Sequence, residues 1–202
     1  MEIATPFVVT VNKVDGSKFV PFGSDLFSKV KFQGGDDGSY DFKTSLVRYL
    51  GGSAKTTAIP ESEELNEFKQ FLLDSANEYL GALGYDSSKN VLSVTSIWLN
   101  DMGSGTFHSE HRHVGSTISG CFYVDVPEGS GLIVIKNPLD MRREDLVKRE
   151  LTPATALNVT LGVRKGDILM WESDIEHSVP TLTFEGRRRC IAFDIKLIDT
   201  KE

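Results

Sequence analysis

The chain has 202 residues, 40% of them hydrophobic and 25% charged, which suits one globular domain with a buried core and excludes a disordered composition. Its net charge of −7 argues against a nucleic-acid partner, and no apolar run reaches the roughly 18–20 residues needed to span a membrane. The N-terminus lacks a signal-peptide pattern, and Cys121 and Cys190 are expected to be buried free thiols, so we expect a cytoplasmic protein.

The first 90 residues are expected to support a C-terminal core. Phe7–Val14 has the pattern of an edge strand, and Ser24–Lys31 and Thr44–Leu50 are candidates for short helices. A longer helix is predicted at about 62–83, because apolar residues recur in it every three or four positions. Acidic residues at its start and glycines at its end favour the same limits.

Residues 91–198 are predicted to be mainly β-structure, within a single domain spanning 1–202. Short runs rich in β-branched and aromatic residues alternate with glycine-containing turns, which favours a sandwich or a small barrel. The polar, irregular segment 139–160 is predicted to be a surface loop. The predicted strands are Val91–Asn100, Thr117–Val126, Gly131–Lys136, Asp167–Trp171, Ser178–Phe184 and Cys190–Ile198.

The four histidines indicate a metal site. His108, His111 and His113 fall within six residues, just after a glycine-rich turn, and His177 follows much later in the chain. Side chains two residues apart on a strand share a face, so two of the first three could bind an ion that His177 also reaches. Imidazole ligands suit iron, zinc, copper and nickel, and no cysteine has the spacing of a zinc finger.

Two overlapping ligand sets fit this spacing. His111, His113 and His177 would give three neutral ligands. His108, Glu110 and His177 would give two histidines and a carboxylate, the usual set of non-haem iron oxygenases. If a strand continued through this segment, His111 and His113 would share a face with polar residues of the next strand, which favours the first set.

Strand alternation also separates three consecutive arginines. Arg188 would share a face with the small side chains of Cys190 and Ala192, whereas Arg187 and Arg189 would lie on the opposite face. The small neighbours leave room for a carboxylate, which a guanidinium can bind through two parallel hydrogen bonds. Arg188 is therefore the candidate for binding an acidic ligand, with solvent exposure as the alternative for each of the three.

In their order along the chain, these motifs resemble the 2-oxoglutarate and Fe(II)-dependent oxygenases of marine bacteria and their phages, which are distantly similar to prolyl hydroxylases. The resemblance implies a double-stranded β-helix, or jelly roll, and a dioxygenase that uses Fe(II), 2-oxoglutarate and O2. It implies hydroxylation of an unidentified substrate, with conversion of 2-oxoglutarate to succinate. The matching residues cover roughly the C-terminal half and are Trp98–Asn100, His111–His113, Ser119–Val124, Gly131, Pro138, Gly166–Trp171, His177–Pro180 and Arg188–Phe193.

The resemblance also assigns roles to residues. His111, His113 and His177 would be the metal ligands and the catalytic residues, and Tyr123 and Arg188 would bind the far carboxylate of 2-oxoglutarate. The expected substrate is a small molecule or a peptide, and the oligomeric state stays open, with a homodimer as one option.

One departure from the related hydroxylases concerns the third ligand. Those enzymes have His-x-Asp where this chain has His111-x-His113. Either three histidines bind the metal, or a nearby carboxylate such as Glu110 replaces one of them.

Two other functions fit part of the pattern. A cupin-type metal-dependent dioxygenase or isomerase would explain Gly105 and His111-x-His113, but the glutamate expected shortly afterwards is absent and Arg188 would have no role. A non-catalytic jelly-roll binding module would not need ligand histidines, Tyr123 and Arg188 together.

Overall fold

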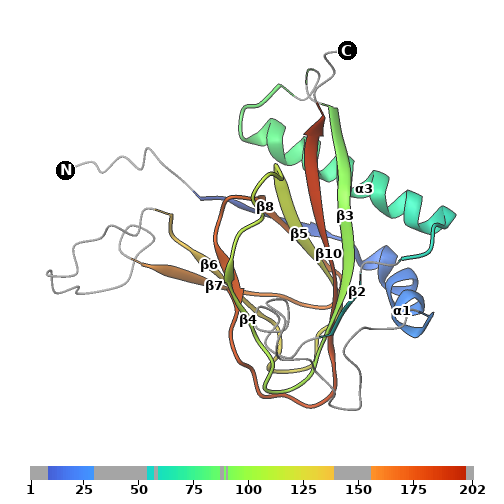
Figure 1. Cartoon of the computed structure of the whole chain (residues 1–202), viewed down its shortest axis with the longest axis vertical. Coiled ribbons are helices and arrows are strands. Elements are labelled where there is room, and N and C mark those ends of the chain that lie inside the picture. Colours follow the sequence, from blue (N-terminus) through green and yellow to red (C-terminus); the bar gives the residue numbers. More distant parts are fainter. Residues whose placement is uncertain are drawn as a thin grey trace, which may run out of the picture.

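The computed structural model describes residues 9–29, 54–56, 59–86, 89, 91–138 and 156–198. In these ranges ten strands form two antiparallel sheets, one with the order β1-β8-β5-β10-β3-β2 and one with the order β4-β9-β6-β7 (Figure 1). The strands are β1 (Val11–Asp15), β2 (Ala54–Thr56), β3 (Val91–Met102), β4 (His108–His111), β5 (Ile118–Asp125), β6 (Leu132–Lys136), β7 (Asn158–Gly162), β8 (Asp167–Glu172), β9 (His177–Val179) and β10 (Arg188–Ile198). The helical elements are η1 (Ser17–Phe19), α1 (Val20–Lys29) and α3 (Glu63–Ala82).

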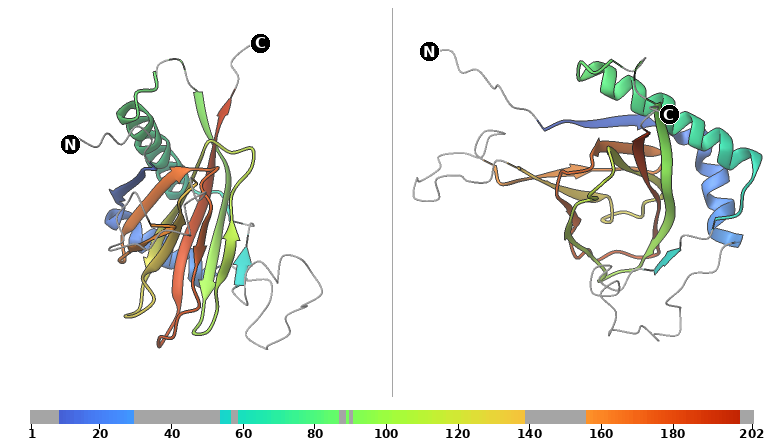
Figure 2. Two further views of the ribbon diagram at one scale, coloured as in Figure 1. Left: turned by 90° about the vertical axis from the view of Figure 1, so that its left-hand side faces the viewer. Right: turned by 45° about the horizontal axis from the view of Figure 1, so that its top comes forward.

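The strand order is that of a jelly roll. Strands that are neighbours in space are distant in sequence: β10 lies between β3 and β5, and β9 lies between β4 and β6. The two sheets lie face to face and curve into a barrel-like arrangement, with the helices outside the larger sheet (Figure 2). The predicted double-stranded β-helix is confirmed.

The larger sheet is buried on both faces, so its central strands are apolar at almost every position. On β5, Phe122 and Val124 pack into the core beneath the helices, whereas Cys121 and Tyr123 pack into the core between the sheets. Successive side chains of a strand point to opposite faces, so each face of β5 contributes to a different core. Cys121 and Tyr123 therefore line the space between the sheets.

Helix α3 covers the outer face of the larger sheet together with α1 (Figure 2). Ser62 caps its first turn, because its hydroxyl accepts a hydrogen bond of 3.1 Å from the backbone N–H of Leu65. Phe68 and Leu72 lie on its buried face. The predicted helix at 62–83 is confirmed, and neither helix in the described ranges is long and apolar enough to cross a membrane.

Two predicted elements in the C-terminal half were too long. The predicted strand Ser178–Phe184 ends at Val179, where Pro180 has no N–H to donate to a neighbouring strand. The end of the predicted loop 139–160 is strand β7, which pairs with β6 at the edge of the smaller sheet. Most residues of β7 are exposed, so it lacks the apolar alternation that predicts a strand.

At the N-terminal end, the predicted edge strand Phe7–Val14 corresponds to β1, which begins at Val11 and pairs with β8. The predicted helix Ser24–Lys31 corresponds to α1, which begins four residues earlier, at Val20. The predicted helix Thr44–Leu50 lies outside the described residues.

Candidate metal centre and carboxylate pocket

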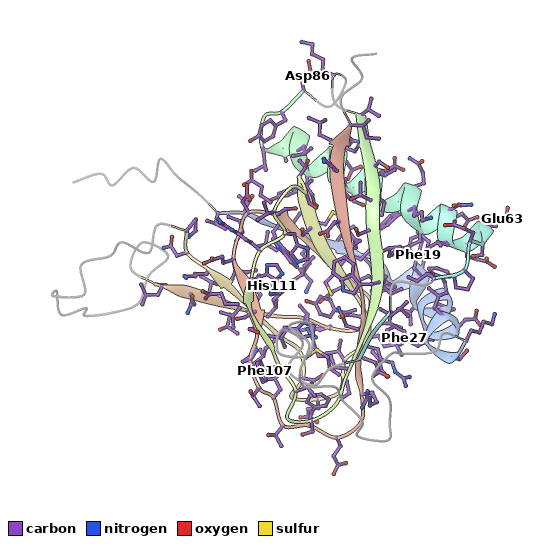
Figure 3. All side chains as sticks on the ribbon, in the orientation of Figure 1. Phe19, Phe27, Glu63, Asp86, Phe107 and His111 are labelled. Carbon is purple, nitrogen blue, oxygen red and sulfur yellow. The ribbon has the colours of Figure 1, made fainter. Side chains whose placement is uncertain are left out.

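Three histidines come together between the two sheets. His111 ends β4 and pairs in register with His177, the first residue of β9, while His113 follows β4 in a loop. The ring centroids of His111 and His177 are 4.1 Å apart, and one potential ligand atom of each of the three side chains lies within 4.8 Å of the others. Figure 3 shows His111 in the space between the sheets. Within the described ranges, this is the one cluster of three such groups with metal-binding spacing.

A β-bulge in β4 determines which side chains face this centre. His108 pairs with Val179 and His111 with His177, so an advance of three residues along β4 lies opposite an advance of two residues along β9. The extra residue changes the strand phase, so His108 and His111 both line the inner cavity. Glu110 faces outwards, where its carboxylate lies 2.8 Å from the Nζ of Lys136.

The structure therefore brings His111, His113 and His177 together and does not bring Glu110 to them. His108 lies in the wall of the same cavity, outside the three-histidine cluster. The premise that a strand continues through His113 is wrong, because β4 ends at His111 and His113 reaches the cluster from a loop.

Hydrogen bonds fix the orientation of the imidazoles. His111 Nδ1 lies 2.7 Å from the carbonyl oxygen of Ser109, and His177 Nδ1 lies 3.1 Å from that of Ile175. A carbonyl only accepts, so each Nδ1 must donate a proton, which leaves the lone pair on Nε2. The Nε2 of His113 is buried and has no hydrogen-bond partner among the described residues. This donor set fits Fe(II).

The surroundings of His177 favour its neutral form. Burial, followed by the neighbouring His111, lowers the pKa of His177 from 6.5 to about 3. His177 is therefore neutral near pH 7, which is the state in which histidine binds a metal.

A second group of polar side chains lies in the same cavity, around Arg188. This residue is only 1% exposed, and its guanidinium lies 5.1 Å from the centre of the Tyr123 ring. One of its N–H groups donates to the sulfur of Met102 at 3.0 Å. In the described part of the chain, Arg188 Nε and the Tyr123 hydroxyl have no hydrogen-bond partner. Two buried donors and a buried positive charge fit a carboxylate ligand.

The other two arginines have a different environment, as strand alternation predicts. Arg187 Nε donates to Asp101 Oδ1 at 2.8 Å, and Arg189 Nε lies 3.6 Å from the same oxygen. Their side chains are 39% and 38% exposed. Arg188 is therefore the arginine that faces the cavity.

Inward-facing residues of β10 connect the two parts of the site. They run from Asp194, whose carboxylate contacts His113, through Ala192 and Cys190 to Arg188. The metal cluster and the guanidinium thus lie towards opposite ends of one narrow cavity. Its walls are formed by Trp98, Asn100, His108, His111, His113, Gly120, Cys121, Tyr123, Ile133, Trp171, His177, Val179, Arg188, Cys190 and Ala192.

Both cysteines are buried free thiols, as predicted, and both contribute to this cavity wall. A hydrogen bond from Cys121 and the positive charge of Arg188 together lower the pKa of Cys190 to about 7, against the opposing effect of burial.

Sequence reasoning missed three polar residues of the site. Asp194 accepts a hydrogen bond from His113 at 2.7 Å. Trp171 and Asn100 line the cavity, and the indole N–H of the first and the amide oxygen of the second have no hydrogen-bond partner among the described residues. Strand alternation places Trp171 and Asn100 on inward faces, but no spacing motif distinguishes them from core residues.

A jelly roll with three clustered histidines and a buried arginine in one cavity fits a non-haem metal enzyme that also binds a carboxylate. Residues 96–194 match the family described as "Putative 2OG-Fe(II) oxygenase", and this segment contains every residue of the candidate site. The chain belongs to the 2-oxoglutarate and Fe(II)-dependent oxygenases. Fe(II), 2-oxoglutarate and O2, the predicted cofactor and cosubstrates, are those of this family.

Solved structures of such oxygenases share the fold. The viral collagen prolyl hydroxylase of Paramecium bursaria Chlorella virus-1 has a TM-score of 0.58 and 12% identity, over 93% of this chain and 96% of that chain. A Pseudomonas putida prolyl-4-hydroxylase has a TM-score of 0.58 and 11% identity, over 93% of this chain and 92% of the hydroxylase chain. HygX from Streptomyces hygroscopicus, solved with nickel and 2-oxoglutarate, has a TM-score of 0.59 and 12% identity, over 93% of this chain and 83% of the HygX chain. In a sequence comparison with curated proteins, none matches this chain.

Proposed function

We propose that this oxygenase binds Fe(II) through His111, His113 and His177, binds 2-oxoglutarate through Arg188 and Tyr123, and hydroxylates a small molecule or a peptide. The observation that carries this proposal is the presence of both groups in one cavity. A histidine cluster alone would fit a cupin, and a buried arginine alone would fit a binding module. Together they fit a metal enzyme with an acidic cosubstrate.

Arg188 and Tyr123 hold the far carboxylate of the cosubstrate in this proposal. Burial raises the pKa of Tyr123 well above its usual value, so its hydroxyl stays protonated and donates a hydrogen bond. Arg188 supplies the opposite charge and further N–H donors. Because both side chains are buried, these charge-assisted hydrogen bonds form where water does not weaken them.

The chemistry supplied by bound iron and its cosubstrates is oxidation of a substrate C–H bond by O2, coupled to decarboxylation of 2-oxoglutarate to succinate and CO2. The protein orients the ligands, since the carbonyl groups of Ser109 and Ile175 hold the rings of His111 and His177. Trp171 lies against His177, with 4.6 Å between the ring centroids, and its buried indole N–H, unpartnered among the described residues, would be a donor for the carboxylate at the metal end of the cosubstrate.

Both substrate classes have precedent among similar structures. A prolyl hydroxylase from Trichoplax adhaerens was solved with a peptide fragment, and HygX was solved with hygromycin B. We propose a peptide or a small molecule for this enzyme on the same basis. The two free thiols support a reducing compartment such as the cytoplasm.

The test is succinate formation from 2-oxoglutarate. Metal-free protein is supplied with Fe(II), ascorbate, 2-oxoglutarate and O2, and succinate is measured by mass spectrometry, first without a substrate and then with peptide and small-molecule panels. We expect slow uncoupled succinate formation that is lost in His177→Ala and in Arg188→Ala. Glu110→Gln is the matched control and should keep the uncoupled succinate formation, because Glu110 faces outwards. Iron binding without succinate formation and without affinity for 2-oxoglutarate would overturn the proposal.

A further inference from the structure

Asp194 has an unusual position for a buried carboxylate. It lies on β10, is 9% exposed, and its Oδ1 accepts hydrogen bonds of 2.7 Å from His113 Nδ1 and from Ser119 Oγ. Ser119 Oγ also lies 2.8 Å from Ser173 Oγ. Both serines are buried, so the carboxylate is held in place by a network shielded from water.

In the described part of the chain, the basic side chain that contacts the Asp194 carboxylate is His113, with Nδ1 2.7 Å from Oδ1. Burying a carboxylate costs free energy unless the charge is paired. Asp194 has no lysine or arginine of the described residues beside it and instead contacts a proposed ligand histidine, which suggests that it acts on this histidine. The opposite ring nitrogen, His113 Nε2, is the buried atom that has no partner among those residues. The imidazole thus has a carboxylate on one nitrogen and a position suited to a metal on the other.

The other two ligand histidines differ in this respect. His111 and His177 donate to backbone carbonyl groups, which are neutral, and only His113 donates to a charged oxygen. The ring of His113 is also stacked on Trp98, with 5.7 Å between centroids and 19° between the planes. Its orientation is therefore fixed both by the stack and by the carboxylate.

The contact between Asp194 and His113 affects the net charge of the metal centre. A ligand set of two histidines and one carboxylate carries one negative charge, whereas a set of three neutral histidines carries none. We infer that Asp194 is the carboxylate of this metal centre, acting through His113 instead of binding the metal itself. It is a positioning residue that directs His113 Nε2 to the metal and makes this imidazole a stronger ligand. The inference rests on the proposed three-histidine site.

The test measures metal affinity and not turnover. Metal-free protein is titrated with Co(II) under anaerobic conditions and followed by visible absorption. Asp194→Asn keeps the shape of the side chain and removes the charge, and we expect Co(II) affinity to fall by about 10–100-fold. Asp101→Asn is the matched control: Asp101 is a buried carboxylate on the adjacent strand β3 that pairs with Arg187, so its Co(II) affinity should stay within about twofold of wild type.

A second variant covers the case in which Asp194→Asn does not fold. Ser119→Ala leaves the carboxylate and removes one of its two hydrogen bonds, and it should weaken Co(II) by about threefold to tenfold, within the range for such outer contacts. A purely structural role would instead lower the thermal stability of the metal-free protein and leave Co(II) affinity unchanged. Wild-type Co(II) affinity in folded Asp194→Asn, or in Ser119→Ala if the former is unfolded, would overturn the inference.

His177→Ala separates this inference from the proposed function. If His177→Ala loses Co(II) while Asp194→Asn keeps wild-type affinity, the three-histidine site stands and the role of Asp194 is wrong. If His177→Ala itself keeps Co(II), the proposed site is wrong.

Discussion

Replacing Arg188 by methionine should remove most of the affinity for 2-oxoglutarate. The guanidinium is 1% exposed, so its hydrogen bonds to a carboxylate form out of contact with water. Each hydrogen bond to a charged group contributes about 1.5–3 kcal/mol, and two such bonds contribute about 3–6 kcal/mol. Because a factor of ten corresponds to about 1.4 kcal/mol, the Kd should rise by about 10²–10⁴-fold.

Arg187→Met and Arg189→Met are the matched controls. Both side chains are more than one third exposed and pair with Asp101, and exposed ion pairs contribute about 0–1 kcal/mol, so the Kd should change by less than about fivefold. The assay is calorimetric titration of 2-oxoglutarate into Zn(II)-loaded protein, which prevents turnover.

Thermal unfolding gives an independent readout of the same binding. At a hundred times its Kd, 2-oxoglutarate should stabilise the wild-type protein by about 2.7 kcal/mol, or roughly 5–10 °C for a chain of this size. At the same concentration, Arg188→Met should gain at most about 0.4 kcal/mol, or roughly 1–2 °C. Equal losses in all three arginine variants would refute the reasoning, because it depends on Arg188 alone facing the cavity.

Three further predictions concern the metal end of the cavity. Metal content measured after Fe(II) loading should be lost in His113→Ala and kept in Glu110→Gln; the reverse result would favour the carboxylate set. Burial, followed by the neighbouring His111, lowers the pKa of His177 from 6.5 to about 3 in the folded protein. Because the unfolded chain takes up this proton more readily, the contribution of neutral His177 to the stability of metal-free protein is complete above about pH 6.5 and is lost as the pH falls towards 3. Denaturant unfolding at pH 7.5 and 5 should therefore differ less in His177→Gln than in wild type, and an equal difference would contradict the assignment. Trp171→Phe keeps the ring against His177 but removes the N–H, so the Kd for 2-oxoglutarate should rise by about tenfold in the calorimetric assay, and wild-type affinity would exclude that hydrogen bond.

Features encoded by local periodicity could be predicted from the sequence. The apolar stripe of α3, with acidic residues at its start and glycines at its end, predicted its limits to within one residue, and the apolar runs predicted the long strands of the larger sheet. Alternation along β10 also separated Arg188 from its neighbours, because β10 pairs with β3 in continuous register there, and the irregularity in its pairing with β5 places the extra residue on β5. These inferences need only the spacing of side chains along one element.

Features that depend on pairing between distant elements could not be predicted in this way. The bulge in β4 reverses the strand phase between His108 and His111, and it is visible only in the register with β9. Asp194 lies 81 residues from His113, so its contact depends on how β10 is placed in the sheet. Strands β4 and β7 are polar or exposed and so lack the apolar alternation that identifies a strand.

The most direct measurement is a crystal structure of the protein with Mn(II) and the 2-oxoglutarate analogue N-oxalylglycine, in which anomalous scattering locates the metal. We expect one metal peak bound by the Nε2 atoms of His111, His113 and His177, with the far carboxylate of the analogue on Arg188. A carboxylate oxygen of Glu110 or Asp194 bound directly to the metal, or an analogue that does not reach Arg188, would contradict this account.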